Sequence, residues 1–243
     1  MDQGIIRTST AHFDILQMNH SRANVVNSVF LELLTRRISE IPQDRTLLLM
    51  GNGHFFSAGI DLKYAHELDS RQMTGFIDEF QELLLNILNR SGFSAVLLNG
   101  HAVAGGFLIS CTADLRLTIP NHFKMGMNDR ELGIQLPPVP AKLIQLSLGN
   151  QAENIVGTGQ FVTSEILQQI GFLRHITDNN LEELGAVLEK QIEAVDWREQ
   201  KIERQREMAS HVQHCYLEET RKFVHAWCSP EARFKRSTVL ERL

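Results

Sequence analysis

The chain has 243 residues, of which 43% are hydrophobic and 22% are charged, as expected for one large globular domain with or without an appendage. A net charge of −5 gives no support for a nucleic-acid surface. Three cysteines without CxxC or Cys/His spacing indicate free thiols and no metal site. The start of the chain does not resemble a signal peptide, and the apolar window 91–111 is broken at Asn99-Gly100. We therefore expect a cytoplasmic protein that does not enter a membrane.

The first half of the chain predicts a layered α/β core. Alternating apolar and polar residues over 4–18 predict a β-hairpin. A helix capped by Asn27 or Ser28 should follow, and its core-facing residues would be Val29, Leu33, Leu34 and Ile38. The next predicted elements are a strand at 46–50, a helix at 73–89, a strand at 95–98, a helix at 107–113 and a strand at 114–119. A strand that is apolar on both sides, such as 46–50, belongs in the centre of a sheet covered by helices.

The second half becomes increasingly helical. Its predicted elements are a helix at 141–148, a short helix at 151–156, a helix begun by Thr163 and ended by Gly171, a strand at 172–176, and helices from 180 onward. We divide the chain into an α/β core over 1–190 and a C-terminal helical region over 191–243. Helices without a core of their own should pack on the body or on a neighbouring subunit.

Two apolar stretches that contain glycine follow the predicted strands at 46–50 and 95–98. They cover residues 55–62 and 99–107, and each leads from a strand into a helix. A strand that turns into a helix leaves backbone N–H groups without intrahelical partners, and such groups can hold a negative charge. The two turns together predict a pair of N–H donors aimed at one oxygen atom.

These stretches occur with other motifs in an order that resembles the crotonase (enoyl-CoA hydratase/isomerase) superfamily. The motifs are Ala23-Asn24, FSAGIDL at 56–62, NGHAVAGG at 99–106, Ala113-Asp114, Gly133 with Pro137, and Gly171-Phe172. The resemblance implies an α/β fold that is a crotonase-like spiral of ββα units with a C-terminal helical region. It also implies assembly as a homotrimer or a dimer of trimers.

The same resemblance implies an acyl-CoA thioester substrate, with coenzyme A as part of the substrate and no tightly bound cofactor. The thioester oxygen would lie in an oxyanion hole between the backbone N–H groups of Ala58 and Gly105, which would stabilise enolate character. The residues expected along coenzyme A are Ser21, Arg22 and Ala23 at the pantetheine and nucleotide, and Asp61 and Leu62 near the adenine. Arg22 is a candidate partner for a phosphate.

Enoyl-CoA hydratases of this superfamily use two glutamates, and this chain has Leu108 and Asp129 at the two positions. Adding water needs both carboxylates, whereas moving a proton from C2 to C4 needs a single base that returns the proton. The departure favours a Δ3,Δ2-enoyl-CoA isomerase with Asp129 as the base. Glu131 would share a face with Asp129 in an extended segment and is the alternative base.

Other functions stay open at this point. A hydratase with altered acid chemistry is the second hypothesis, and a catalytically impaired acyl-CoA-binding homologue is a third. The same oxyanion site would also serve decarboxylation or an acyl-carrier-protein substrate. His101 and Cys111 are predicted to be structural, and residues 63–90 are predicted to form the pocket walls.

Overall fold

The structure is a computed structural model, and it describes residues 4–128, 135–175, 180–194 and 196–241. Its main layer is a six-stranded sheet in which the first two strands are antiparallel and the others are parallel. In spatial order the strands are β1 (Gly4–Ser9), β2 (Phe13–Asn19), β3 (Thr46–Met50), β5 (Ser94–Leu98), β7 (Leu115–Thr118) and β9 (Arg174–His175). The predicted hairpin and the predicted strands of the core are confirmed.

A second, smaller sheet consists of three short parallel strands: β4 (Phe55–Ser57), β6 (His101–Val103) and β8 (Met125–Gly126). Each of them follows a strand of the large sheet, so that β3–β4, β5–β6 and β7–β8 are successive pairs along the chain. A helix follows each pair, which confirms the predicted spiral of ββα units. The side chain of Asn99 joins the corners of the first two units, because its Oδ1 accepts from the N–H of Gly51 (2.9 Å) and its Nδ2 donates to the Gly51 carbonyl (3.1 Å).

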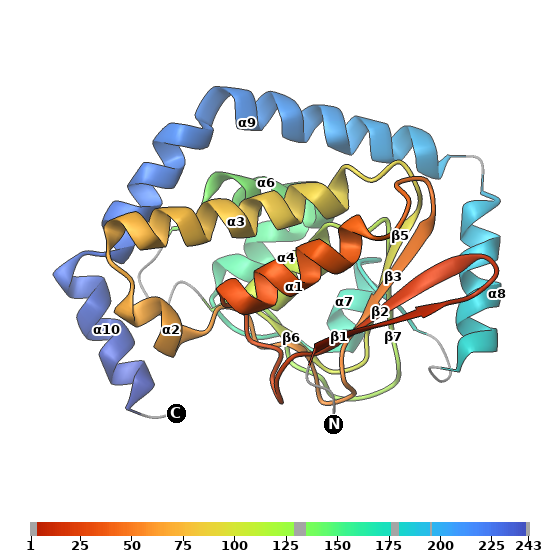
Figure 1. Cartoon of the computed structure of the whole chain (residues 1–243), viewed down its shortest axis with the longest axis horizontal. Helices are drawn as coiled ribbons and strands as arrows, with labels where there is room; N and C mark the ends of the chain where they lie inside the picture. The colour runs from red at the N-terminus through yellow and green to blue at the C-terminus, as the bar shows by residue number, and fades with distance from the viewer. Residues whose placement is uncertain (1–3, 129–134, 176–179, 195, 242–243) are drawn as a thin grey trace.

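Helices cover both faces of the large sheet (Figure 1). The α-helices described are α1 (Ser28–Ser39), α2 (Leu62–Glu67), α3 (Ser70–Leu88), α4 (Gly105–Cys111), α6 (Pro138–Leu148), α7 (Ser164–Gln169), α8 (Leu181–Ile192), α9 (Trp197–Trp227) and α10 (Pro230–Leu240), of which α2 and α10 lie away from the sheet. The larger core cluster includes residues of α1, α3, α4 and α6, and the smaller one joins α8 to the other face of the sheet through Leu184 and Leu188. Strand β3 is covered on both faces, because Leu47 belongs to the larger cluster and Leu48 to the smaller one. This agrees with the central position predicted for a strand that is apolar on both sides.

The local sequence signals for the helices hold with few exceptions. The side chain of Asn27 caps α1 by accepting from the N–H of Phe30 at 3.1 Å. The prediction that Val29 faces the core is wrong, because Val29 is 55% exposed, whereas Phe30 and Leu31 are buried. Thr163 precedes α7, but its side chain makes no capping hydrogen bond.

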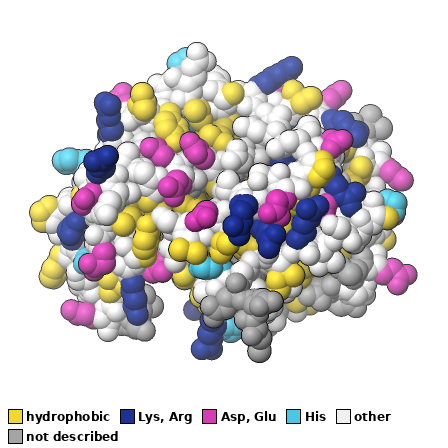
Figure 2. Space-filling view, viewed as in Figure 1, with side chains coloured by type: hydrophobic (Ala, Val, Ile, Leu, Met, Phe, Trp, Pro, Cys, Tyr) yellow, Lys and Arg dark blue, Asp and Glu magenta, His cyan; other side chains and the backbone are white. Residues whose placement is uncertain are grey.

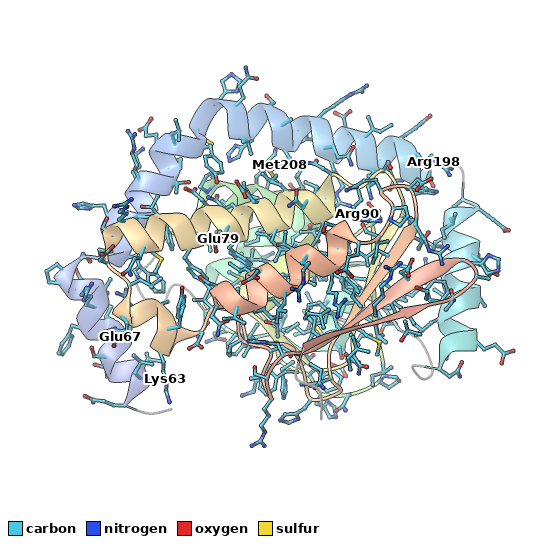
Figure 3. All side chains as sticks on the ribbon, in the orientation of Figure 1. Lys63, Glu67, Glu79, Arg90, Arg198 and Met208 are labelled. Atoms are coloured by element: carbon cyan, nitrogen blue, oxygen red, sulfur yellow. The ribbon has the colours of Figure 1, made fainter. Side chains whose placement is uncertain are left out.

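The C-terminal helix α9 runs along α3 and packs against both α3 and α6 (Figure 1). Buried and partly buried polar contacts fix it at several points. Gln81 of α3 donates to Thr220 Oγ1 (3.2 Å) and accepts from the N–H of Val139 in α6 (3.2 Å), and Tyr216 donates to Asp78 (2.9 Å). Figure 3 labels Met208 on the same helix, and its side chain is buried in the main core. The C-terminal helices therefore pack on the body of the same chain.

The first turns of α9 are held by a buried ion pair. Lys201 Nζ lies 2.7 Å from Asp114 Oδ2 and also donates to the carbonyl of Gly92 (2.7 Å). Arg204 Nη1 lies 3.4 Å from the other carboxylate oxygen, Asp114 Oδ1. Arg204 also donates to the carbonyls of Cys111 and Thr112 at the end of α4. Burial lowers the pKa of Lys201, and the carboxylate of Asp114 opposes that effect. The pair fixes α9 relative to the strand β7.

Charged side chains of both signs are interspersed over the face shown in Figure 2. Within the described part of the chain, no helix combines the length and the apolarity needed to cross a membrane.

Removing one partner of the buried pair should destabilise the fold. We expect Lys201→Met to lower the free energy of unfolding by about 3–5 kcal/mol, because it leaves Asp114 short of a buried cation. Chemical denaturation monitored by circular dichroism measures this change. The control is Lys222→Met, which removes a solvent-exposed lysine of the same helix and should change little. Equal effects of the two substitutions would contradict the importance of the pair.

Candidate functional site

A cavity of about 500 Å³ lies where the two glycine turns meet the C-terminal helices. Apolar side chains from α3, α9 and α10 form much of its wall, together with the turns themselves. Among the described residues, the polar side chains that line it are Asp61, Lys63 and Asn128. A largely apolar cavity with a few polar groups is the usual form of a small-molecule site.

The first turn is fixed by backbone and hydroxyl hydrogen bonds. The N–H of Ala58 donates to the carbonyl of Ala23 at 2.9 Å, and the N–H of Gly59 donates to Ser57 Oγ at 3.1 Å. Ser57 Oγ donates in turn to the carbonyl of Asn24 at 2.7 Å. This hydroxyl is buried and both of its hydrogen bonds are to the backbone, so it is a structural group.

The prediction that Ala58 supplies a free N–H donor is corrected by this geometry, because its N–H already has a carbonyl partner. Both neighbours of Ile60 make hydrogen bonds to Val26. The Gly59 carbonyl accepts from the N–H of Val26, and the N–H of Asp61 donates to the Val26 carbonyl. The N–H of Ile60 has no partner among the described residues. Ile60 lines the cavity and is therefore the donor that this turn can offer.

The second turn leads directly into α4. Gly105 is the first residue of that helix, so its N–H has no intrahelical acceptor. Ala104, just before it, has the unusual torsion angles φ 48° and ψ −121° and donates its N–H to the Gly126 carbonyl at 2.8 Å. An alanine in this conformation is strained, and such strain often occurs where a backbone is shaped for a ligand.

The two turns are in contact. A β-carbon at Gly59 would lie 2.7 Å from the nitrogen of Gly105, and one at Gly105 would lie 3.5 Å from the nitrogen of Ile60. Gly59 also has φ +80°, which favours glycine. The N–H groups of Ile60 and Gly105 are thus brought together at the cavity by a close approach that only glycine permits at position 59.

Asn24 holds the loop against which the first turn lies. It is buried with φ 47°, and its Nδ2 donates to the carbonyls of Met18 (2.9 Å) and Phe56 (3.2 Å). Its Oδ1 accepts from the N–H of His20 at 3.1 Å. Since the neighbouring Ala23 carbonyl receives the Ala58 N–H, Asn24 indirectly fixes the position of the donor turn.

The residues expected along coenzyme A fall into two groups. Ala23, Asp61 and Leu62 line the cavity, while Asp61 also caps α2 by accepting from the N–H of Tyr64 at 3.2 Å. Ser21 and Arg22 lie outside the cavity lining, and the side chain of Asn52 donates to both of their carbonyls at 3.2 Å. Arg22 is exposed. The structure brings three of the five predicted residues to the cavity.

The expected acid–base positions are only partly described. Leu108 is buried and lines the cavity, so an apolar group occupies the position where hydratases of the superfamily carry a glutamate. Asp129 and Glu131 lie outside the described residues. Asn128, the last described residue before them, lines the cavity.

His101 and Cys111 have the structural surroundings that were predicted. Nδ1 of His101 accepts from the N–H of Lys124 at 2.8 Å, and its ring packs against Phe55 and Phe123. Burial lowers the pKa of His101, as do the nearby His54 and Lys124. Cys111 is fully buried, which raises the pKa of its thiol to about 11. Among the described residues, no three or more His, Cys, Asp or Glu side chains are arranged to hold a metal ion.

Several residues of the cavity wall escaped the prediction from sequence, among them those from the C-terminal helices. Phe223 and Trp227 come from α9 and Val239 comes from α10, whereas the walls were expected from 63–90. That expectation is met in part by Lys63, Ile77 and Phe80. The four-residue spacing of Phe223 and Trp227 is a visible sign of an apolar helix face, but it does not reveal what the face covers.

A family model described as Enoyl-CoA hydratase/isomerase matches residues 11–226 of the chain. Among curated proteins, enoyl-CoA delta isomerase 1, mitochondrial, of Homo sapiens is 28% identical over 135 residues, which are 52% of this chain and 45% of that protein. The putative enoyl-CoA hydratase/isomerase YngF of Bacillus subtilis is 27% identical over 185 residues, 72% of this chain and 70% of that protein. The first relatives are covered over only 45–55% of their own length.

Among solved structures, human mitochondrial Δ3,Δ2-enoyl-CoA isomerase superposes with a TM-score of 0.89 at 21% identity, covering 99% of this chain and 98% of that chain. At this identity the likeness concerns the fold. This fold, together with the family-model match over residues 11–226, identifies a protein of the crotonase superfamily. The chain belongs to the enoyl-CoA hydratase/isomerase family, whose model spans most of its length.

Adding a side chain where the two turns meet should destabilise the protein. We expect Gly59→Ala to lower the free energy of unfolding by at least about 2 kcal/mol, because the methyl group meets the Gly105 nitrogen and the backbone has positive φ. Urea denaturation measures the loss. The control is Gly75→Ala in α3, where a β-carbon meets nothing within 4 Å and should stabilise by about 0.5–1 kcal/mol. A Gly59→Ala protein of wild-type stability would contradict the described packing.

Proposed function

We propose that the protein acts on acyl-CoA thioesters as a Δ3,Δ2-enoyl-CoA isomerase with one carboxylate base. The observation that carries the proposal is the pair of N–H groups from Ile60 and Gly105, brought together at a largely apolar cavity that also contains Leu108. The human and Arabidopsis relatives whose names are enoyl-CoA delta isomerases support the reaction class.

The paired donors would act on the thioester oxygen. Removing a proton from C2 of a 3-enoyl thioester moves electrons into the carbonyl and creates an enolate oxygen. Two backbone N–H groups fixed by the rest of the fold stabilise this charge without reorganising, and one such donor is worth about 3 kcal/mol of the barrier. In this proposal Ile60 takes the role that was predicted for Ala58, and Gly105 keeps its predicted role.

A single base would complete the isomerisation by taking the proton at C2 and returning it at C4. We assign this role to Asp129, which directly follows the cavity residue Asn128, and keep Glu131 as the alternative. Leu108 opposes hydration, since it offers neither a proton nor a hydrogen bond to a water molecule. A hydratase with altered acid chemistry and a binding homologue without turnover are the competing functions.

The remaining expectations from sequence are part of the same proposal. Coenzyme A would be bound as part of the substrate, with Ala23, Asp61 and Leu62 along it and Arg22 near a phosphate. We further propose a homotrimer or dimer of trimers in the cytoplasm, which sedimentation of the purified protein and cell fractionation would test.

Loss of the base should stop turnover while leaving binding intact. We expect Asp129→Asn to lower kcat for 3-enoyl-CoA by about 10²–10⁴-fold, because proton transfer by a positioned base contributes that much. The formation of 2-enoyl-CoA is followed spectroscopically, and the Kd for a saturated acyl-CoA serves as a check on binding. Glu131→Gln is the matched control and should retain activity. A large loss in Glu131→Gln alone would move the base to Glu131, and no turnover by the wild-type protein would refute the isomerase.

The residue at position 108 should decide between isomerisation and hydration. We expect Leu108→Glu to add measurable hydration of crotonyl-CoA, because it supplies the second carboxylate that water addition requires. Formation of 3-hydroxybutanoyl-CoA is measured by chromatography, with Leu108→Gln as a control of equal size without the acid. Hydration of crotonyl-CoA by the wild-type chain at a rate matching its isomerisation would instead favour the hydratase.

A further inference from the structure

Aromatic side chains of the C-terminal helix α9 form part of the cavity wall. Phe223 and Trp227 lie one helical turn apart, both are buried, and their ring centroids are 5.8 Å apart. Val239 of α10 lines the cavity beside them. In Figure 1, α9 reaches α10 beside α2, the helix on which Figure 3 labels Lys63 and Glu67. This part of the wall is therefore apolar and comes from the C-terminal end of the chain.

Trp227 is held by two elements besides its own helix. Its indole Nε1 donates to the carbonyl of Ala65 in α2 at 3.4 Å. The guanidinium carbon of Arg236 in α10 lies 4.1 Å from the centroid of the Trp227 ring. The ring is 3% exposed, so α2, α9 and α10 together leave it little freedom to turn. A large side chain held in this way makes a rigid part of the cavity wall.

Arg236 has few partners other than this ring. It is 1% exposed, and within the described part of the chain its Nε and Nη1 have no hydrogen-bond partner. Burial and the nearby charge of Arg233 lower the pKa of Arg236 to about 10. A buried cation is expensive without a partner, and the face of a tryptophan ring is the aromatic surface that attracts it most. Among the described residues, the stack with Trp227 is thus a favourable contact that partly offsets the burial of this guanidinium.

Resting on the proposed function, we propose that Trp227 limits the length of the acyl chain and that Arg236 is the positioning residue that holds Trp227 in place. The preferred ligands are thioesters whose acyl tail is apolar and uncharged and ends before this ring. A longer tail must displace the indole, and with it both the Ala65 hydrogen bond and the Arg236 stack. A tail with a terminal carboxylate would bury its charge among Phe223, Trp227 and Val239.

Binding of saturated acyl-CoAs tests this proposal without requiring turnover. Calorimetry gives Kd for a series from butanoyl-CoA to hexadecanoyl-CoA. Each buried methylene group should tighten binding about fourfold until the tail meets Trp227, and Kd should then stop falling. In Trp227→Ala the fall should continue for about two further methylene groups, giving at least about tenfold tighter binding of the longest chains relative to wild type. Trp227→Leu serves the same purpose with a smaller loss of volume if the alanine variant does not fold.

Arg236→Met tests the positioning role, because it keeps the length of the side chain and removes the charge. It should relax the length limit in the same direction as Trp227→Ala, and Arg236→Lys should restore it in part. A merely structural arginine would instead lower the affinity for all chain lengths equally. Leu217→Ala, at a residue 69% exposed on α9, is the control and should keep the wild-type profile.

The outcomes separate the two levels of the proposal. Failure of every acyl-CoA to bind would refute the proposed function itself. Binding with the same length profile in wild type, Trp227→Ala and Trp227→Leu would refute the role of Trp227 alone. Tighter binding of an ω-carboxyacyl-CoA than of its methyl-ended counterpart, lost in Arg236→Met, would show that Arg236 contacts the ligand and would overturn the assignment of an uncharged tail.

Discussion

The contact between Gly59 and Gly105 is the constraint on which the site depends. It brings together two backbone turns from different ββα units, so that the N–H groups of Ile60 and Gly105 meet at one cavity. The surrounding interactions maintain this contact. Asn24 fixes the loop that receives the Ala58 N–H, and Asn99 joins the corners of the two units. Because Asn24 and Asn99 are buried, the donors would need no rearrangement in the proposed reaction when charge develops on an oxygen.

The C-terminal helices complete the same site from the other side. Helix α9 is fixed at its start by the ion pair of Lys201 with Asp114, and further along by the hydrogen bond from Tyr216 to Asp78. Near its end the helix places Trp227 in the cavity wall. The contacts that stabilise the helix on the body therefore also set the shape of the cavity. The division of the chain into a core over 1–190 and a helical region over 191–243 stays a prediction.

The chemistry around the donors is asymmetric. Leu108 is one turn from Gly105 on α4 and presents hydrocarbon to the cavity. In the proposed reaction this leaves one carboxylate, from the segment after Asn128, to move a proton along the acyl chain. The apolar wall that includes Phe80 and Trp227 would suit a hydrocarbon tail and would keep water away from the proposed enolate. The proposal therefore has three parts: the paired N–H donors, the single base and the apolar wall for the substrate's tail.

The sequence by itself determined the local elements and the family resemblance. The hairpin, the Asn27 cap, the strand β3 and the helix α3 follow from periodicity and capping, which are properties of neighbouring residues. Only the tertiary structure decided which N–H groups are free. The N–H of Ala58 donates to the carbonyl of Ala23, and a partner so far away along the chain cannot be predicted from neighbouring residues. The same holds for Trp227, whose place in the wall depends on how α9 crosses the body, and for Val29, whose exposure depends on what packs against α1.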